Sequence, residues 1–551
     1  MLDKIMNSIL FLLYATSTIA ISGKTFVFDN IIYPKWICCF FAIAFLSALC
    51  AAKKLLTNKK QENEVKLNIC LTLSYITILV VLLFRDIDTF IKVFAFTALY
   101  LYFYTMSNKC SHIIRKAIIA AGLLDAFVGF YQYIQGENLI TGAYDSHVGF
   151  SLSIVFAIIT ILHYGLSCNK SLTTKTFSVI CSLFLTYIII CSGSRIGILA
   201  LAVYFSLLVL KKKILLFTFI TLMFCMSLLF KSESTKGRYF IYKTTLSMFD
   251  TPKSVLIGKG KNGFRKEYML CQAQQLKKES ENVKFRADNI KHPLNEFLLL
   301  YVNHGIIFTL LCIIALFWTF VHLPKGSIHR YLLITIIVYS LFAYPFHYPT
   351  TWIILAWILA NIKSQSHFCI DTNYQFMKIW HVATFLLLFY NIAKSLSFHI
   401  KWNEAQEMCY IGLTEKANNI YKRISKQTEF DAFHYNYASF LNKHGMKNEA
   451  NIEIEKCNIV DYDTQLLRGR ISESNKQFSQ ALYYYEQALR MCPNRFTPLY
   501  YMFCVYNTTG NYAMRNKVAH CIMNKKVKIK SAEINIIKQR VEYTLHETPH
   551  K

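Results

Sequence analysis

The sequence contains about 12–13 apolar stretches, most of them close to the roughly 20 residues that a helix needs to cross a bilayer, with a short one at 350–362. Hydrophobic residues make up 54% of the 551 residues and charged residues only 17%, which is too few to cover the surface of a soluble protein. We therefore predict an all-α fold, a polytopic membrane helix bundle. The predicted spans are 5–22, 36–52, 67–84, 88–106, 113–135, 147–167, 176–191, 195–210, 212–230, 294–320, 330–346, 350–362 and 377–398.

Basic residues are distributed unevenly between the loops that join these spans. Loops after even-numbered spans carry 17 Lys and Arg residues, whereas loops after odd-numbered spans carry four when the long loop is left out. Basic residues favour the cytoplasmic side of a membrane. The bias therefore predicts a cytoplasmic N-terminus and places the long loop and the C-terminal region on the outer side.

Four segments follow from this pattern: a first part of the bundle at 1–230, a long loop at 231–293, a second part at 294–399 and a C-terminal region at 400–551. The long loop holds 14 Lys and Arg residues against 6 Asp and Glu residues. A basic segment at a membrane surface suits an anionic substrate, although such lysines also simply solvate a loop. Charge alone leaves both interpretations open.

The C-terminal region is charged and amphipathic, and it contains an internal repeat. Gly510-Asn511-Tyr512 repeats Lys476-Gln477-Phe478 at an offset of 34, and Gly445–Ala450 repeats Lys476–Ala481 at an offset of 31. With the closing Cys492-Pro493-Asn494, this pattern resembles a tetratricopeptide α-solenoid. Such arrays bind partner proteins, so a protein partner is expected there. A generic array of helical hairpins is the alternative.

Short motifs in and around the long loop resemble the O-antigen ligase and polymerase superfamily. They are Gly237-Arg238 with Pro252 and Gly258–Phe264, then Ala287–Gly305, Gly193-Ser194-Arg195 and Tyr344–Pro349. In that family a histidine directly precedes an asparagine, whereas here Leu294 precedes Asn295 and His292 lies further upstream. The literal Gly258-x-Gly260-x-x-Gly263 pattern has no strand-turn-helix setting, so dinucleotide binding is rejected.

The resemblance implies an enzyme of the bacterial inner (cytoplasmic) membrane that takes a glycan from undecaprenyl diphosphate on the periplasmic face. The acceptor is lipid A core, another glycan or a protein. Arginine suits the diphosphate because its guanidinium forms two parallel hydrogen bonds to phosphate oxygens and stays charged. The expected diphosphate-binding residues are therefore Arg195, Arg238 and Arg265, and Arg286 is a further candidate. His292 is the expected base and Asn295 the residue that orients it or the sugar. The resemblance implies no metal or other cofactor.

Alternative functions remain open. A repeat-unit polymerase shares the donor chemistry and differs only in its acceptor. A flippase or other transporter with a scaffold tail is disfavoured by the long outer loop and by the scarcity of charge within spans. A membrane-anchored adaptor does not need so many spans. Beyond glycan, acceptor and membrane lipids, we expect no nucleic-acid partner. Asp125, inside a predicted span, has no evident partner in the sequence.

Overall fold

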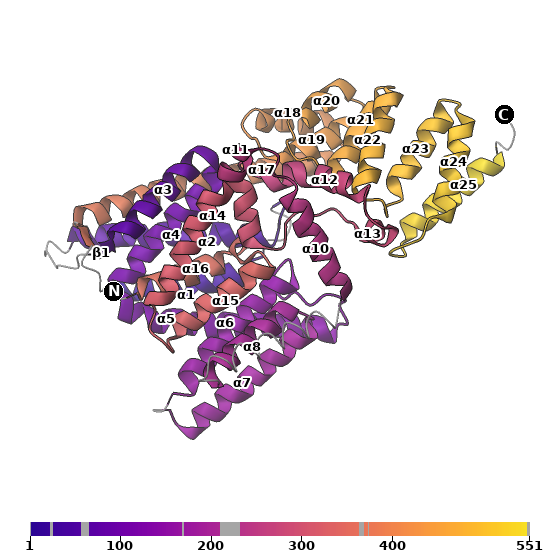
Figure 1. The fold of residues 1–551 in the computed structure, drawn as a ribbon. Coiled ribbons are helices and arrows are strands. Elements are labelled where there is room, and N and C mark those ends of the chain that lie inside the picture. The colour runs from indigo at the N-terminus through magenta and orange to yellow at the C-terminus, as the bar shows by residue number, and fades with distance from the viewer. Residues whose placement is uncertain are drawn as a thin grey trace. The chain divides into compact units, whose positions relative to one another are not determined.

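The computed structural model describes residues 2–21, 26–56, 65–167, 170–209, 232–362, 369–372 and 374–547. The predicted span at 212–230 lies outside these residues. So do several of the basic residues counted above: Lys24, Lys59, Lys60, Lys211, Lys212, Lys213 and Lys363. Nearly all described elements are α-helices, as predicted (Figure 1).

In the first part of the chain the helices are α1 (Leu2–Ile19), α2 (Ile32–Leu56), α3 (Ile69–Arg85), α4 (Ile87–Thr105), α5 (Ser107–Ile134), α6 (His147–Gly165), α7 (Leu172–Cys191) and α8 (Arg195–Val209). The long loop contains α10 (Ser232–Leu246), α11 (Pro252–Ile257), α12 (Gly263–Leu276) and α13 (Glu281–Arg286). Then follow α14 (Glu296–His322), α15 (Ile328–Phe342), the 3₁₀ turn η1 (Pro345–His347), α16 (Pro349–Ala360) and α17 (Tyr374–Tyr410).

The C-terminal region contains α18 (Thr414–Ser425), α19 (Asp431–Lys443), α20 (Lys447–Glu455), α21 (Tyr462–Ser474), α22 (Phe478–Met491), α23 (Thr497–Thr508), α24 (Tyr512–Asn524) and α25 (Ala532–Glu547). Two short strands, β1 (Val65–Asn68) and β2 (Cys369–Thr372), pair antiparallel with Val65 opposite Thr372. This small ribbon departs from the all-α prediction without changing the helical architecture.

Six described helices are long and apolar enough to cross a membrane: Ile32–Lys53, Ile87–Thr105, His147–Gly165, Leu172–Cys191, Glu296–His322 and Gln375–Tyr410. Each reaches the length that a bilayer core requires. Four shorter apolar helices accompany them in the described part of the chain, at Tyr75–Arg85, Arg195–Leu208, Ile328–Phe342 and Pro349–Ala360. The chain is therefore compatible with a multi-pass membrane protein.

Large apolar side chains of α7 are exposed along one face. Phe177, Ile180 and Leu183 are 64–66% exposed, and their spacing of three residues places them on the same side of the helix. Exposing such a stripe of apolar side chains to water costs free energy, whereas contact with lipid tails does not. Helix α14 carries a similar stripe at Leu310, Ile314, Phe317 and Val321. These faces are suited to contact with lipid.

The described residues divide into two compact units. The first comprises those up to Ser232, together with Leu294–Leu300 and Ile306–Asn403. The second comprises Glu233–Pro293, Tyr301–Gly305 and those from Glu404 onward. The long loop and the C-terminal region, which the sequence treats as separate segments, thus belong to one unit.

Helix α6 forms the centre of the first unit. It packs against α5, α7, α8 and α15 (Figure 1), and most of its residues are buried. A buried polar contact joins it to α5: the hydroxyl of Ser153 donates to the Asp125 carboxylate, which also accepts from the backbone N–H of Ala143 at 2.9 Å. Asp125 therefore has partners that the sequence did not reveal, and their contribution is structural.

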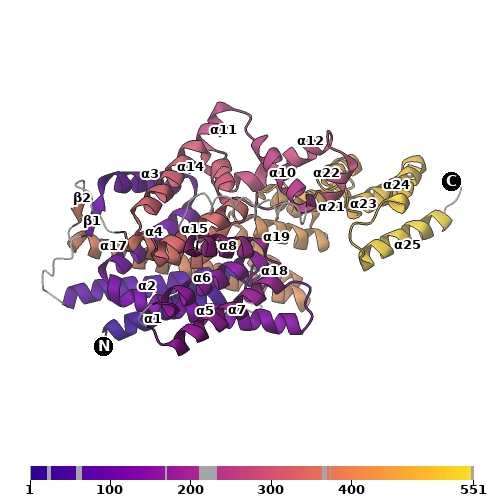
Figure 2. The same cartoon turned by 60° about the horizontal axis from the view of Figure 1, so that its bottom comes forward.

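The C-terminal helices of the second unit follow one another as antiparallel pairs (Figure 2). A turn with the same backbone conformation recurs four times, with a positive φ at Gly412, Gly445, Lys476 and Gly510. At each of these turns the next N–H donates to the carbonyl five residues back, for example Leu413 to Met408 and Met446 to Leu441. Glycine is favoured in this conformation, so Lys476 is the strained member of the series.

Candidate functional site

A polar cluster lies at one end of the apolar bundle in the first unit. We define it as Lys92, Asp145, Glu296, His347 and Tyr348. These residues come from α4, the loop before α6, the start of α14, η1 and the turn that precedes α16. Ionisable groups at the edge of an apolar bundle cost free energy, so they are commonly functional.

Asp145 joins the loop before α6 to the turn before α16. The Tyr348 hydroxyl donates to Asp145 Oδ1 at 2.9 Å, and His347 Nε2 lies 3.7 Å from Asp145 Oδ2. Ser146 Oγ lies 2.8 Å from the Tyr348 hydroxyl and also caps α6 by accepting from the Gly149 N–H. The cap of α6 and the carboxylate beside His347 are therefore fixed by the same short segment.

His347 is held from its backbone as well. Trp36 Nε1 donates to the His347 carbonyl at 3.0 Å, and Lys92 Nζ lies 4.5 Å from the centroid of the Trp36 ring. Burial lowers the pKa of His347; Asp145 opposes this shift and Lys92 adds to it. The imidazole is thus kept neutral near pH 7, in the form that accepts a proton.

Glu296 belongs to the same end of the bundle. It is 8% exposed, its carboxylate accepts from the backbone of Phe346, and its Oε2 makes no hydrogen bond with any described residue. Asn295, just before it, caps α14 by accepting from the Leu298 N–H at 2.9 Å and donates to the Leu341 carbonyl at 3.0 Å. Leu294 adopts a positive φ of 55°, which leads the chain into this cap.

The residues predicted from the sequence are divided between the two units. Asn295 and Arg195 belong to the first, where Arg195 begins α8 with an exposed side chain. Arg238 on α10, Arg265 on α12 and His292 before α14 belong to the second, each partly buried. Their assembly into one site stays a prediction.

The residue before Arg195 lies in a chain of hydroxyl groups. Ser194 Oγ lies 2.7 Å from Ser151 Oγ, which lies 2.8 Å from the Tyr339 hydroxyl. Ser194 also accepts from the Gly197 N–H, so it caps α8 and fixes the point at which Arg195 leaves the bundle. Its predicted role in binding a diphosphate stays a prediction.

Two of the motif segments found in the sequence contact each other in the second unit. Lys259 N–H donates to the Val302 carbonyl at 2.7 Å and Gly260 N–H to the Asn303 carbonyl at 2.9 Å. Helix α14 is interrupted at Gly305, whose φ is 84° and ψ 175°. The glycine motif of the loop, Gly258–Gly263, therefore packs directly on the backbone of α14 beside the interruption at Gly305.

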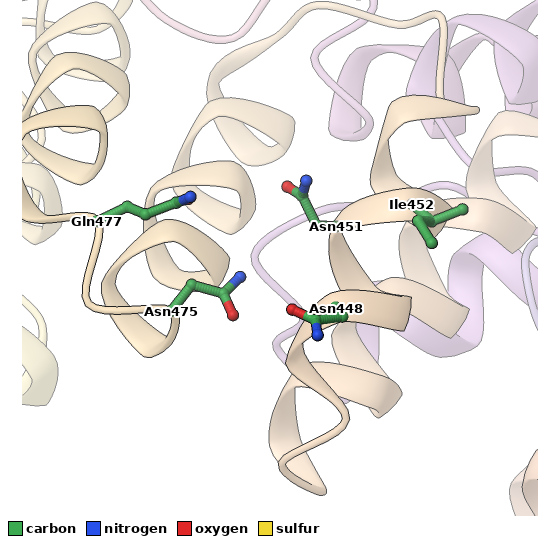
Figure 3. Close-up of a pocket in the computed structure, with 5 residues that line it drawn as sticks. All are labelled: Asn448, Asn451, Ile452, Asn475 and Gln477. Atoms are coloured by element: carbon green, nitrogen blue, oxygen red, sulfur yellow. The ribbon is translucent and has the colours of Figure 1, made fainter.

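A separate polar cavity of about 360 Å³ lies between two helical pairs of the second unit. The amide groups of Asn475 and Gln477 face those of Asn448 and Asn451 across it, whereas Ile452 points away (Figure 3). Amides donate and accept hydrogen bonds without charge, so this lining suits neutral polar groups. Among the described residues, no group of three or more His, Cys, Asp or Glu side chains is arranged to hold a metal ion.

The sequence missed Asp145, Glu296, Lys92 and the role of His347. Two motifs contained members of the cluster: Tyr344–Pro349 contains His347, and Ala287–Gly305 contains Glu296, but neither indicated a partner. Asp145 and His347 lie about 200 residues apart, and no local pattern relates them. No protein-family model matches this chain, and no curated protein matches it.

Proposed function

We propose that this chain is a glycosyltransferase of the bacterial inner membrane that moves a glycan from undecaprenyl diphosphate to an acceptor on the periplasmic side, as an O-antigen ligase or a protein O-oligosaccharyltransferase does. The observation that carries the proposal is the polar cluster at one end of an apolar helix bundle, in which the His347 imidazole lies 3.7 Å from the Asp145 carboxylate. The motif resemblance supports the same reaction.

The reaction needs few groups. An acceptor hydroxyl attacks the anomeric carbon of the glycan, the bond from that carbon to the diphosphate oxygen breaks, and the hydroxyl proton passes to a base. The diphosphate leaves with its charge, which Arg195, Arg238 and Arg265 neutralise. Lys92 is a further cation in the polar cluster.

Two histidines are candidates for the base. His292 follows from the motif resemblance, and His347 follows from its lowered pKa and its position beside Asp145. Asn295 then orients the sugar from the start of α14, where its side chain is fixed by the α14 cap and the Leu341 carbonyl.

We further propose that residues 404–547 include a tetratricopeptide-like array that faces the periplasm. The four recurring turns support this, as do small residues at matching positions five residues after each of three turns: Ala417, Ala450 and Ala481 are each fully buried between helices. The fourth position holds Arg515, a buried cation whose guanidinium donates to Asn507 and Asn516.

The proposal is tested by replacing Arg195, Arg238 and His292 by Ala one at a time. Each variant should lose glycan transfer by roughly 10²-fold or more, because each removes a group that acts on charge developing in the reaction. Membrane levels of the protein should stay normal, and Arg330→Ala, far along the chain on α15, serves as a matched control. Full activity in all three variants would remove this site assignment.

A further inference from the structure

The segment 285–289, which joins α13 to the stretch carrying His292, is held by side chains of the C-terminal helices. Asn494 Nδ2 donates to the carbonyls of Phe285 at 3.0 Å and Ala287 at 2.6 Å. Lys528 Nζ donates to the Arg286 carbonyl at 3.0 Å. These are the carbonyls that the end of a helix leaves without an intrahelical partner.

The side-chain amide of Gln272, which belongs to the long loop, also binds this segment. Gln272 on α12 is 1% exposed, and its Nε2 donates to the carbonyls of Asp288 at 2.9 Å and Met491 at 2.8 Å. Every carbonyl from Phe285 to Asp288 is therefore bonded to a side chain. The bond to the Ala287 carbonyl is buried, and a buried carbonyl left without a partner costs free energy.

Charged groups reinforce the same segment. Arg495 donates to Asp288 Oδ1 at 2.7 Å, Lys528 Nζ lies 3.7 Å from Asp288 Oδ2, and Asn289 Nδ2 donates to Asp463 Oδ2 at 3.0 Å. Burial alone would raise the pKa of Asp288, but hydrogen bonds from Arg495 and the Asn289 N–H, together with the charges of Arg495 and Lys528, lower it. Asp288 is thus ionised and attached to the helices near neutral pH.

We propose that the C-terminal helices position the long loop at 231–293. Asn494 and Lys528 are the positioning residues: they fix segment 285–289 and thereby His292, three residues beyond it. The C-terminal helices then help to build the proposed active site and are not only a docking surface for partner proteins. The part of this proposal that concerns activity rests on the proposed function. The attachment itself does not.

The sharpest variant is Asn494→Asp in the full chain. It keeps the size of the side chain and replaces the donor with a carboxylate facing two carbonyl oxygens. Lys528→Met, at a more exposed position, removes the hydrogen bond to the Arg286 carbonyl and the charge beside Asp288, and it leaves no buried charge behind. Asn535→Asp makes the same chemical change at an exposed position of α25 and is the matched control.

The first readout is the rate of trypsin cleavage after Arg286, followed by mass spectrometry of the purified protein in detergent. Cleavage requires segment 285–289 to open locally. Loss of two hydrogen bonds should accelerate it about tenfold or more in Asn494→Asp, with a smaller increase in Lys528→Met and none in Asn535→Asp. Wild-type cleavage rates in both test variants would overturn the attachment.

The second readout is the kinetics of glycan transfer with the lipid-linked donor. If His292 is the base, misplacing it should lower kcat more than it raises KM for the donor, which the arginines bind. Faster cleavage with an unchanged kcat would overturn the positioning role. Absence of transfer in the wild type would instead contradict the proposed function, and the cleavage rates would still decide whether the C-terminal helices hold the segment.

Discussion

At the scale of single residues, the pair of His347 and Asp145 is the part of the polar cluster with the most specific chemistry. Because burial lowers the pKa of His347, its neutral form persists below the usual value of about 6.5. A reaction that uses it as a base loses rate only as the pH falls through this lowered pKa. The acid limb of the pH–rate profile should therefore lie below pH 6.5.

His347→Ala tests this assignment. We expect kcat for glycan transfer to fall about 10²- to 10⁴-fold and the acid limb to disappear, as measured with purified protein between pH 4.5 and 8. His322→Ala is the matched control, since its ring stacks on Trp318 at the other end of α14. An unchanged profile in His347→Ala would leave His292 as the candidate base.

At the scale of elements, the interruption of α14 at Gly305 determines how the loop packs. A Cβ at Gly305 would lie 2.2 Å from the Leu256 carbonyl oxygen and 2.5 Å from Ile257 Cα. Its φ of 84° with ψ 175° is also a conformation open almost only to glycine. The contact between the loop motif and α14 therefore depends on this residue.

We expect Gly305→Ala to destabilise the protein by roughly 3 kcal/mol or more, because backbone strain and overlap with backbone atoms add. Thermal unfolding in detergent would report this as a lower Tm. Gly237→Ala is the comparison, since Gly237 lies inside α10 with nothing within 4 Å of an added Cβ, and its Tm should not fall. Equal Tm values for both variants would contradict the role given to the interruption.

Elements were easier to predict than contacts. The apolar runs reveal the helices, because length and hydropathy are local properties. They do not reveal that Lys476 adopts the turn conformation that glycine has in the other three pairs, or that Asp125 binds Ser153, because those facts depend on packing between helices. The association of Asp145 with His347 is likewise a tertiary contact, so only one member of the pair fell within a recognisable motif.

At the scale of the whole molecule, segment 285–289 and the C-terminal helices contact each other directly. In a membrane protein of the proposed kind, both must then lie on the same side of the bilayer. This constraint does not depend on counting spans. Combined with the distribution of basic residues, it supports a periplasmic position for both. Under the proposed function, the loop motifs, the proposed base and the helical array would face the compartment in which the lipid-linked glycan is used.

The most direct test of the account is a gel of envelope glycans from cells with and without this protein, with the lipid-linked fraction separated from the acceptor-linked fraction. We predict that its loss leaves long glycan polymers on undecaprenyl diphosphate and removes them from their acceptor. Collapse to single repeat units would reassign the enzyme as a polymerase. An unchanged profile in both fractions would contradict a role in glycan transfer.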